Sequence, residues 1–165
     1  MRDASFATIQ LLFSRGGTIQ HGQLLHHASQ REQQDRVEVF TFLLDKGASE
    51  SINKIMYQDR ESDYLMNMYT GIGTPLHLAA GKGLLDLVKL LVEKGADPLI
   101  KDPRGKIALD RAMFGDHTEV VQFLSPLSVS SSVPRHDFTD KEGFHYRPVP
   151  LTKVLGMGWD KVHYP

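Results

Sequence analysis

Thr74-Pro75-Leu76-His77-Leu78-Ala79-Ala80 is the most informative stretch of this 165-residue sequence. Threonine is a preferred helix N-cap and proline is tolerated at the first helical position, so a helix is predicted to begin at Pro75. His77 follows Thr74 by three residues, where its ring can hydrogen-bond back to the capping residue. Leu76, Ala79 and Ala80 give this helix a small apolar face on which a second helix can lie.

The second helix is predicted over residues 84–94. Its apolar positions 84, 87, 88 and 91 follow helical spacing. Gly83 breaks the first helix, and Gly95 stands where helices commonly end in the left-handed conformation. The pattern therefore indicates a helix–turn–helix unit that is closed by glycine.

These residues resemble one repeat of the ankyrin family, a pair of antiparallel helices followed by an extended hairpin finger. One such unit cannot bury its own apolar face, so neighbouring repeats are expected. Downstream, Leu109 follows Leu76 by 33 residues, which is the ankyrin period. The second helix of that copy is predicted over residues 117–124.

The downstream copy departs from the family pattern at three positions. Ile107 replaces the capping threonine, and Asp110 replaces the histidine. Asp116 stands where repeats usually carry glycine, and aspartate tolerates a left-handed turn. The fold is therefore expected to survive these substitutions.

An upstream copy begins at Gln23-Leu24-Leu25-His26-His27-Ala28, and its second helix is predicted over residues 37–46, ended by Gly47. Leu25 precedes Leu76 by 51 residues, which is about 18 more than one repeat period. The excess is assigned to a charged turn over residues 31–36, which is expected to be solvated, and to the segment between Gly47 and Thr74.

That segment is predicted to be a long finger with a polar centre, residues 58–63, that forms a turn or a short helix. Its flanks carry many apolar and aromatic side chains: Ile52, Ile55, Met56, Tyr57, Tyr64, Leu65, Met66, Met68 and Tyr69. Methionine-rich surfaces deform readily and often bind partners, whereas most apolar side chains are core residues. Both interpretations of the long finger stay open.

The predicted fold class is all-α: an ankyrin-repeat helical solenoid of paired antiparallel helices with hairpin fingers, followed by a disordered C-terminal tail. The domain is expected over residues 5–125, with a partial repeat over 5–17, repeats at about 22–47, 73–97 and 105–125, and an insertion at about 48–72. Pro126 is expected to end the last helix, and residues 126–165 to be a low-structure tail. The partial repeat leaves an apolar face uncovered, which indicates a piece of a longer array or a partner at that end.

Composition and motifs narrow the classes of function. The net charge of −1 and the pI near 6.7 give no electrostatic reason to expect nucleic acid or membrane as a partner. The sequence has no cysteine and no apolar run of membrane-spanning length, so an intracellular protein, cytoplasmic or nuclear, is expected.

The histidines do not indicate a metal or catalytic site. His26 and His77 occupy the family's structural histidine position, and the sequence offers no further spaced ligand cluster near residues 21–27, so neither a metal nor another cofactor is expected. No pairing of a nucleophile with a base is recognisable, and an enzyme is not expected.

The resemblance implies protein–protein binding through a concave surface of finger tips and first-helix positions. By position, the contact residues are Met66, Met68, Tyr69 and Ile72 in the long finger, Lys101, Asp102 and Arg104 in the next finger, and His27, Leu78, Lys82, Arg111 and Phe114 on the first helices. A monomer or part of a longer array is expected. The alternative is a fragment of a larger multidomain protein whose enzymatic or effector module lies outside this chain.

Overall fold

The computed structural model describes residues 4–19 and 23–128, so residues 129–165 of the tail predicted over 126–165 lie outside them. The described part is helical and contains no strand. Its elements are α1 (Phe6–Ser14), α2 (Leu24–Ala28), α3 (Arg36–Asp45), the 3₁₀ helix η1 (Ala48–Ser51), α4 (Glu61–Asn67), α5 (Pro75–Gly81), α6 (Leu85–Glu93), α7 (Ala108–Phe114) and α8 (Thr118–Ser128). The predicted helical solenoid is confirmed.

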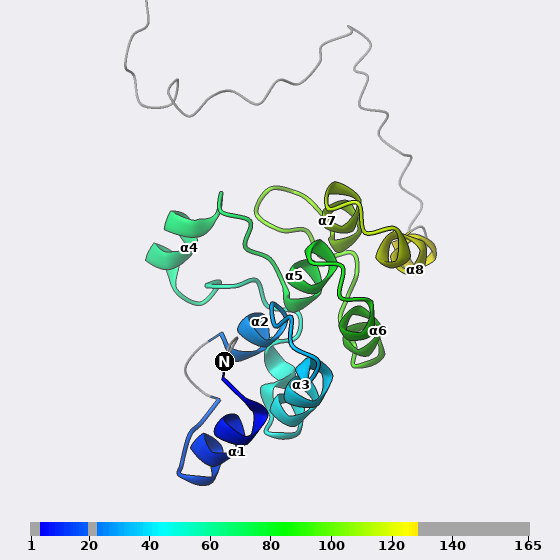
Figure 1. Cartoon of the computed structure of the whole chain (residues 1–165). Helices are drawn as coiled ribbons and strands as arrows, with labels where there is room; N and C mark the ends of the chain where they lie inside the picture. Colours follow the sequence, from blue (N-terminus) through cyan, green and yellow to red (C-terminus); the bar gives the residue numbers. More distant parts are fainter. Residues whose placement is uncertain (1–3, 20–22, 129–165) are drawn as a thin grey trace, which may run out of the picture. The chain divides into compact units, whose positions relative to one another are not determined.

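The helices of this part form two rows (Figure 1). The first row contains α2, α5 and α7, and the second contains α3, α6 and α8. Each first-row helix packs against the second-row helix that follows it in sequence, and α1 packs against α3. Phe6 and Phe13 of α1 contact the Phe42 ring edge to face, with centroid distances of 5.7 and 5.3 Å. Helix α4 stands on the side of the first row that is remote from the second (Figure 1).

The predicted start of α5 is confirmed atom by atom. His77 Nδ1 accepts hydrogen bonds from the Thr74 hydroxyl at 2.8 Å and from the Thr74 N–H at 3.2 Å. Because Nδ1 accepts both, the ring proton is on Nε2, which donates to the Lys106 carbonyl at 3.0 Å. One buried histidine thus caps its own helix and ties it to the finger that follows.

In the third repeat, which contains α7 and α8, a carboxylate takes the place of the histidine at the start of the first helix. Asp110 Oδ2 accepts a hydrogen bond from the Ile107 N–H at 2.9 Å, so aspartate takes over part of the role of the missing histidine. Asp116 has φ +56°, which confirms the left-handed turn predicted at that position.

The core lies between the two rows. It is built from small and branched side chains that are buried almost completely: Leu25, Ala28, Val39, Phe40, Leu43, Leu76, Ala79, Ala80, Leu87, Val88, Leu91, Ala108, Ala112, Val120 and Leu124. The alanines on first-row helices allow the close approach that their position predicts.

The predicted stop at Pro126 is wrong, because α8 continues through this proline to Ser128. Proline lacks an N–H group, so the carbonyl of Gln122 loses its usual partner in the helix. Gln122 is exposed, and water can replace that partner. Ser125 and Ser128 also donate their hydroxyls to the carbonyls of Val121 and Leu124, at 2.6 and 3.0 Å.

The charged turn over residues 31–36 is not simply a solvated loop, because its first arginine is buried. The side chain of Arg31 has 0% exposure and forms a bidentate ion pair with Asp35 over 2.6 and 2.7 Å. Hydrogen bonding to Arg31 lowers the pKa of Asp35. Glu32 of the same turn is exposed and forms an ion pair with Lys82 of the next repeat. The turn therefore joins two repeats, besides facing the solvent.

Candidate functional site

Two equivalent hydrogen bonds show where the insertion enters the repeat pattern. His26 Nε2 donates to the Lys54 carbonyl at 2.8 Å, 28 residues further on, and His77 Nε2 donates to the Lys106 carbonyl, 29 residues further on. Lys54 therefore occupies the place of Lys106. Residue 107 then begins the next repeat at once, whereas residues 55–73 intervene after Lys54. The extra residues follow Lys54, and the predicted insertion at about 48–72 began too early.

The inserted segment is a closed loop. The Met56 N–H donates to the Gly73 carbonyl at 3.0 Å, so the two ends of the segment lie together. We call residues 57–72 the insertion loop. It begins with Tyr57 at φ +65°, a conformation that is unusual for a bulky residue.

The predicted hairpin arms of this finger are absent, since the insertion loop contains α4 and turns but no strand. Its side chains stabilise local turns. Asn67 Nδ2 donates to the Asp63 carbonyl at 2.7 Å, and Arg60 forms an ion pair with Asp63. Such local hydrogen bonds compete with strand pairing.

The apolar side chains of the long finger divide into two groups. Ile52, Met56 and Ile72 are buried at the base of the loop. No residue of α4 is buried, and the side chains there and just beyond it are exposed: Leu65 by 56%, Met66 by 79% and Tyr69 by 77%. We call Leu65, Met66 and Tyr69 the loop patch. Core packing thus accounts for the base of the loop and not for the loop patch.

Arg111 of α7 holds the end of the insertion loop. Its guanidinium donates to the Gly71 and Ile72 carbonyls at 2.7 and 2.8 Å. The same group donates to Asp102 Oδ2 at 3.0 Å from Nε and 2.5 Å from Nη2. One side chain on α7 therefore joins the insertion loop to the next finger.

Asp102 is the buried partner of this arrangement. Its Oδ1 accepts the N–H groups of Arg104 and Lys106 at 2.8 and 2.9 Å, which fixes the turn of the finger over residues 95–106, here called the second finger. Burial on its own would raise the pKa of Asp102. The Lys106 N–H and the Arg111 guanidinium outweigh burial, so the pKa lies below its ordinary value and the carboxylate is charged at neutral pH.

The predicted contact residues differ in their exposure to solvent. Ile72 and Asp102 are buried, so the prediction that they contact a partner as exposed finger residues is wrong. Arg111 is occupied by its framework hydrogen bonds, and Lys82 by its ion pair with Glu32. Half-buried positions are His27, Met68 and Leu78; exposed ones are Met66, Tyr69, Lys101, Arg104 and Phe114.

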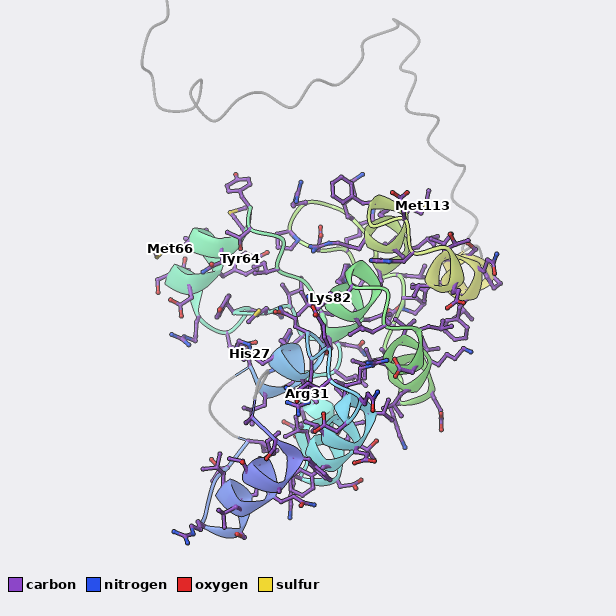
Figure 2. The ribbon with its side chains drawn as sticks, viewed as in Figure 1. His27, Arg31, Tyr64, Met66, Lys82 and Met113 are labelled. Carbon is purple, nitrogen blue, oxygen red and sulfur yellow. The ribbon has the colours of Figure 1, made fainter. Side chains whose placement is uncertain are left out.

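The contact residues predicted from their position in the repeat did not include Leu65 and Met113, which are exposed and apolar. Leu65 lies within the flank whose apolar load the sequence already showed, and Met113 precedes Phe114 on α7. Met113 is 57% exposed and Phe114 is 94% exposed. In Figure 2, Met66 projects from α4 and Met113 from α7. The insertion loop and α7 thus each present exposed apolar side chains.

Two hollows accompany these residues. The first, of about 260 Å³, lies between the insertion loop and the first-row helices, and is lined by His27, Met56, Tyr57 and Leu78 among others. The second, of about 490 Å³, is lined by Asp102, Arg104, Lys106, Asp110, Arg111, Met113 and Phe114. We call the second one the α7 hollow.

The buried histidines are built for structure. Burial lowers the pKa of His26 to about 4 and also lowers the pKa of His77, so both rings are neutral at pH 7. Within residues 4–19 and 23–128, no three His, Asp or Glu side chains converge as metal ligands do. In the same ranges, no helix has both the length and the apolarity needed to cross a membrane. What the described surface offers is shape, exposed apolar groups and charge.

Comparisons with known proteins agree with the fold. A family model described as ankyrin repeats (many copies) matches residues 43–112. A probable E3 ubiquitin-protein ligase of Oryza sativa subsp. japonica is 46% identical over 70 residues, which are 42% of this chain and 13% of that protein. Notch-regulated ankyrin repeat-containing protein B of Danio rerio is 34% identical over 90 residues, 54% of this chain and 81% of that protein. The human Notch-regulated ankyrin repeat-containing protein is 32% identical over 87 residues, 52% of this chain and 76% of that protein.

Proposed function

Because the chain belongs to the ankyrin repeat family, whose repeats are generally protein–protein interaction modules, we propose that it binds a protein partner through the insertion loop, the first-row helices α5 and α7, and the second finger. The similarity to the rice ligase covers 13% of that protein, so a ligase activity is not part of the proposal. An intracellular setting, cytoplasmic or nuclear, is part of it and is supported by the absence of cysteine.

The observation that carries the proposal is the loop patch. Helix α4 buries none of its residues. Its apolar residues Leu65 and Met66, and Tyr69 beyond the helix, are therefore exposed to water. Contiguous exposed apolar groups on a folded domain mark interaction sites. The patch is held in place by the Met56–Gly73 hydrogen bond and by Arg111, which secure both ends of the loop.

The chemistry of the patch suits the centre of an interface. Tyrosine supplies a rigid ring with a polar tip and is enriched among the residues that dominate binding energy. Methionine adapts its shape to an irregular partner surface. The partner would thus dock on a preformed scaffold, and the deformable side chains would complete the fit.

The test compares three forms of the full chain: the wild type, a Met66→Ser/Tyr69→Ser variant, and a Leu11→Ser/Leu12→Ser variant. The last pair is the matched control, because Leu11 and Leu12 on α1 are also exposed apolar residues, at 52% and 57%. Each form is immobilised and exposed to the same cell lysate, and the retained proteins are quantified by mass spectrometry.

A partner that is retained by the wild type and by the α1 variant, and lost by the Met66→Ser/Tyr69→Ser variant, is the expected result. Urea titration must give equal unfolding free energies for the loop variant and the wild type, within about 0.5 kcal/mol, as for surface changes in general. If the loop variant retains every protein that the wild type retains, the loop patch is not a binding site and the proposal fails.

A further inference from the structure

We propose that the α7 hollow receives an acidic segment of the protein partner that carries an apolar anchor residue. This inference rests on the proposed function and specifies the chemistry of the partner at a second place, away from the loop patch. The hollow has a volume of about 490 Å³, which is in the range of clefts that hold ligands.

The walls of the α7 hollow provide the apolar contact. Phe114 is 94% exposed and Met113 is 57% exposed, both at the end of α7. The remaining wall is made largely of arginine and lysine side chains, whose aliphatic stems can cover an apolar group while their charged ends stay in water. An aromatic or aliphatic side chain of a partner would be desolvated in this hollow.

The charge around the hollow is positive. Lys101 and Arg104 are exposed on the second finger, and within the described residues neither forms an ion pair. Lys106 is exposed on the same finger and lines the hollow. The nearby carboxylates are already engaged, since Asp102 pairs with Arg111 and Asp110 accepts the Ile107 N–H. Carboxylates of a partner could therefore pair with Lys101 and Arg104.

The backbone that carries these cations is ordered before any partner binds. The Asp102 N–H donates to the Lys106 carbonyl at 2.8 Å, and the Gly105 N–H donates to the Asp102 carbonyl at 2.9 Å, so the turn that carries Arg104 is closed at its base. A preformed turn lowers the entropy that binding must overcome. The positive rim beside an apolar hollow is complementary to alternating acidic and apolar residues in an extended segment.

Nucleic acid also combines anionic charge with planar apolar groups, but the observations favour protein. Binding of a nucleic acid backbone needs many cations that neutralise successive phosphates. Here the hollow is lined by three cationic side chains, Arg104, Lys106 and Arg111, and the sequence as a whole has a net charge of −1. An acidic protein segment needs no larger positive field than this one.

The probe is a fluorescein-labelled peptide with three aspartates on each side of a central Leu-Phe pair. Its binding to the full chain is followed by fluorescence anisotropy, and the contact is located from the methyl resonances of Met113 and Met66. A peptide with glycines in place of the central pair and a single-stranded oligothymidylate of equal charge serve as comparison ligands.

The expected result is saturable binding of the acidic-apolar peptide, weaker by tenfold or more for the Lys101→Glu/Arg104→Glu variant and for Phe114→Ser. Lys94→Glu is the matched control, because Lys94 is an exposed lysine at the end of the second-row helix α6, and its affinity should equal that of the wild type. The Met113 methyl resonance should shift on binding, and the glycine peptide should bind at least tenfold more weakly.

Several outcomes would overturn the inference: no saturable binding, equal affinity for the finger variant, or oligothymidylate binding as tightly as the peptide. A peptide that shifts the Met66 resonance and leaves that of Met113 unchanged would also overturn it, although it would support the loop patch as a binding site. Conversely, a shift of Met113 together with an inert loop patch in the lysate experiment would refute the loop patch alone. The two proposals can therefore fail separately.

Discussion

Replacing Arg111 by methionine removes the side chain that joins the insertion loop to the second finger. Methionine keeps much of the aliphatic volume but cannot donate hydrogen bonds. The carbonyls of Gly71 and Ile72 would lose their donors, and Asp102 would lose its ion pair. The Asp102 side chain has 0% exposure, so in the wild type its charge is compensated by protein groups and not by bulk water.

The expected cost follows from these contacts. Removing one partner of a buried ion pair usually costs about 3–5 kcal/mol. Here Arg111 is 19% exposed, and Asp102 keeps the N–H groups of Arg104 and Lys106. Both facts lower the cost, so we expect Arg111→Met to reduce the free energy of unfolding by about 2–4 kcal/mol at pH 7.

The loss should depend on pH in a defined direction. The Arg111 guanidinium helps to hold the pKa of Asp102 below its ordinary value, so that pKa should rise in the variant. The folded variant then binds a proton more readily than the folded wild type, while the unfolded chains are alike. By linkage, the stability difference between the two proteins is largest at neutral pH and shrinks as the pH falls through about 4.

Urea titrations at pH 7, 5 and 4, followed by circular dichroism, measure this difference. Arg104→Met is the matched control, because Arg104 is an exposed arginine on the second finger that forms no ion pair with any described residue. The effect of this substitution should stay within about 0.5 kcal/mol. Limited proteolysis should also cut the insertion loop faster in Arg111→Met. A variant as stable as the control, or a difference that grows on acidification, would refute the role assigned to Arg111.

Three further comparisons test the framework of the repeats. Gly83→Ala should lower the melting temperature more than Gly95→Ala does. Both glycines have positive φ, but an added Cβ at Gly83 would lie 2.5 Å from His117 Nδ1, whereas one at Gly95 would meet no atom within 4 Å. Equal melting temperatures of the two variants would contradict this expectation. Leu76→Ala should reduce the unfolding free energy by about 2–5 kcal/mol, because Leu76 is fully buried, and a change near zero in urea titration would show that it is not. Since burial lowers the pKa of His26 to about 4, the unfolded state binds the proton first, and acidification from pH 6.5 to 4 should remove up to about 3 kcal/mol of stability. His26→Gln should flatten this pH dependence, and an unchanged slope would assign it to other groups.

Local patterns explain which parts of the fold could be predicted from the sequence. The start of α5 depends on Thr74, Pro75 and His77, all within one turn, so their types and spacing were sufficient. The same is true of Asp116, whose left-handed conformation follows from its place after a helix. These features need no knowledge of distant residues.

The errors concern residues whose partners are far away or whose environment is not local. Arg111 binds carbonyls that are 40 and 39 residues earlier in the chain, and no periodicity announces such a pair. Arg31 was expected in water because charged turns usually are, yet its pairing with Asp35 allows full burial. Ile72 and Asp102 were carried over as contact residues from their position in the repeat, which does not reveal burial.

The sequence also could not predict which apolar side chains of the long finger are buried and which are exposed. Met56 and Met66 are the same residue type in the same segment, but the first is buried and the second is 79% exposed. The difference depends on where the loop closes, and that is set by the Met56–Gly73 hydrogen bond. Residue type and composition alone predict the same degree of burial for both residues.

The insertion follows the Lys54 carbonyl, which accepts the hydrogen bond of His26. This position can therefore accommodate inserted sequence without disturbing the repeat before it. His26 has already secured the connection to Lys54 before the chain departs, and the ends of the loop return to one another at Met56 and Gly73. Doubling the length of a loop adds only about 0.6 kcal/mol of closure entropy. The part of the loop between residues 57 and 70 can therefore be exchanged, with its own length and specificity, while the buried Ile72 and the carbonyls that Arg111 binds stay in place.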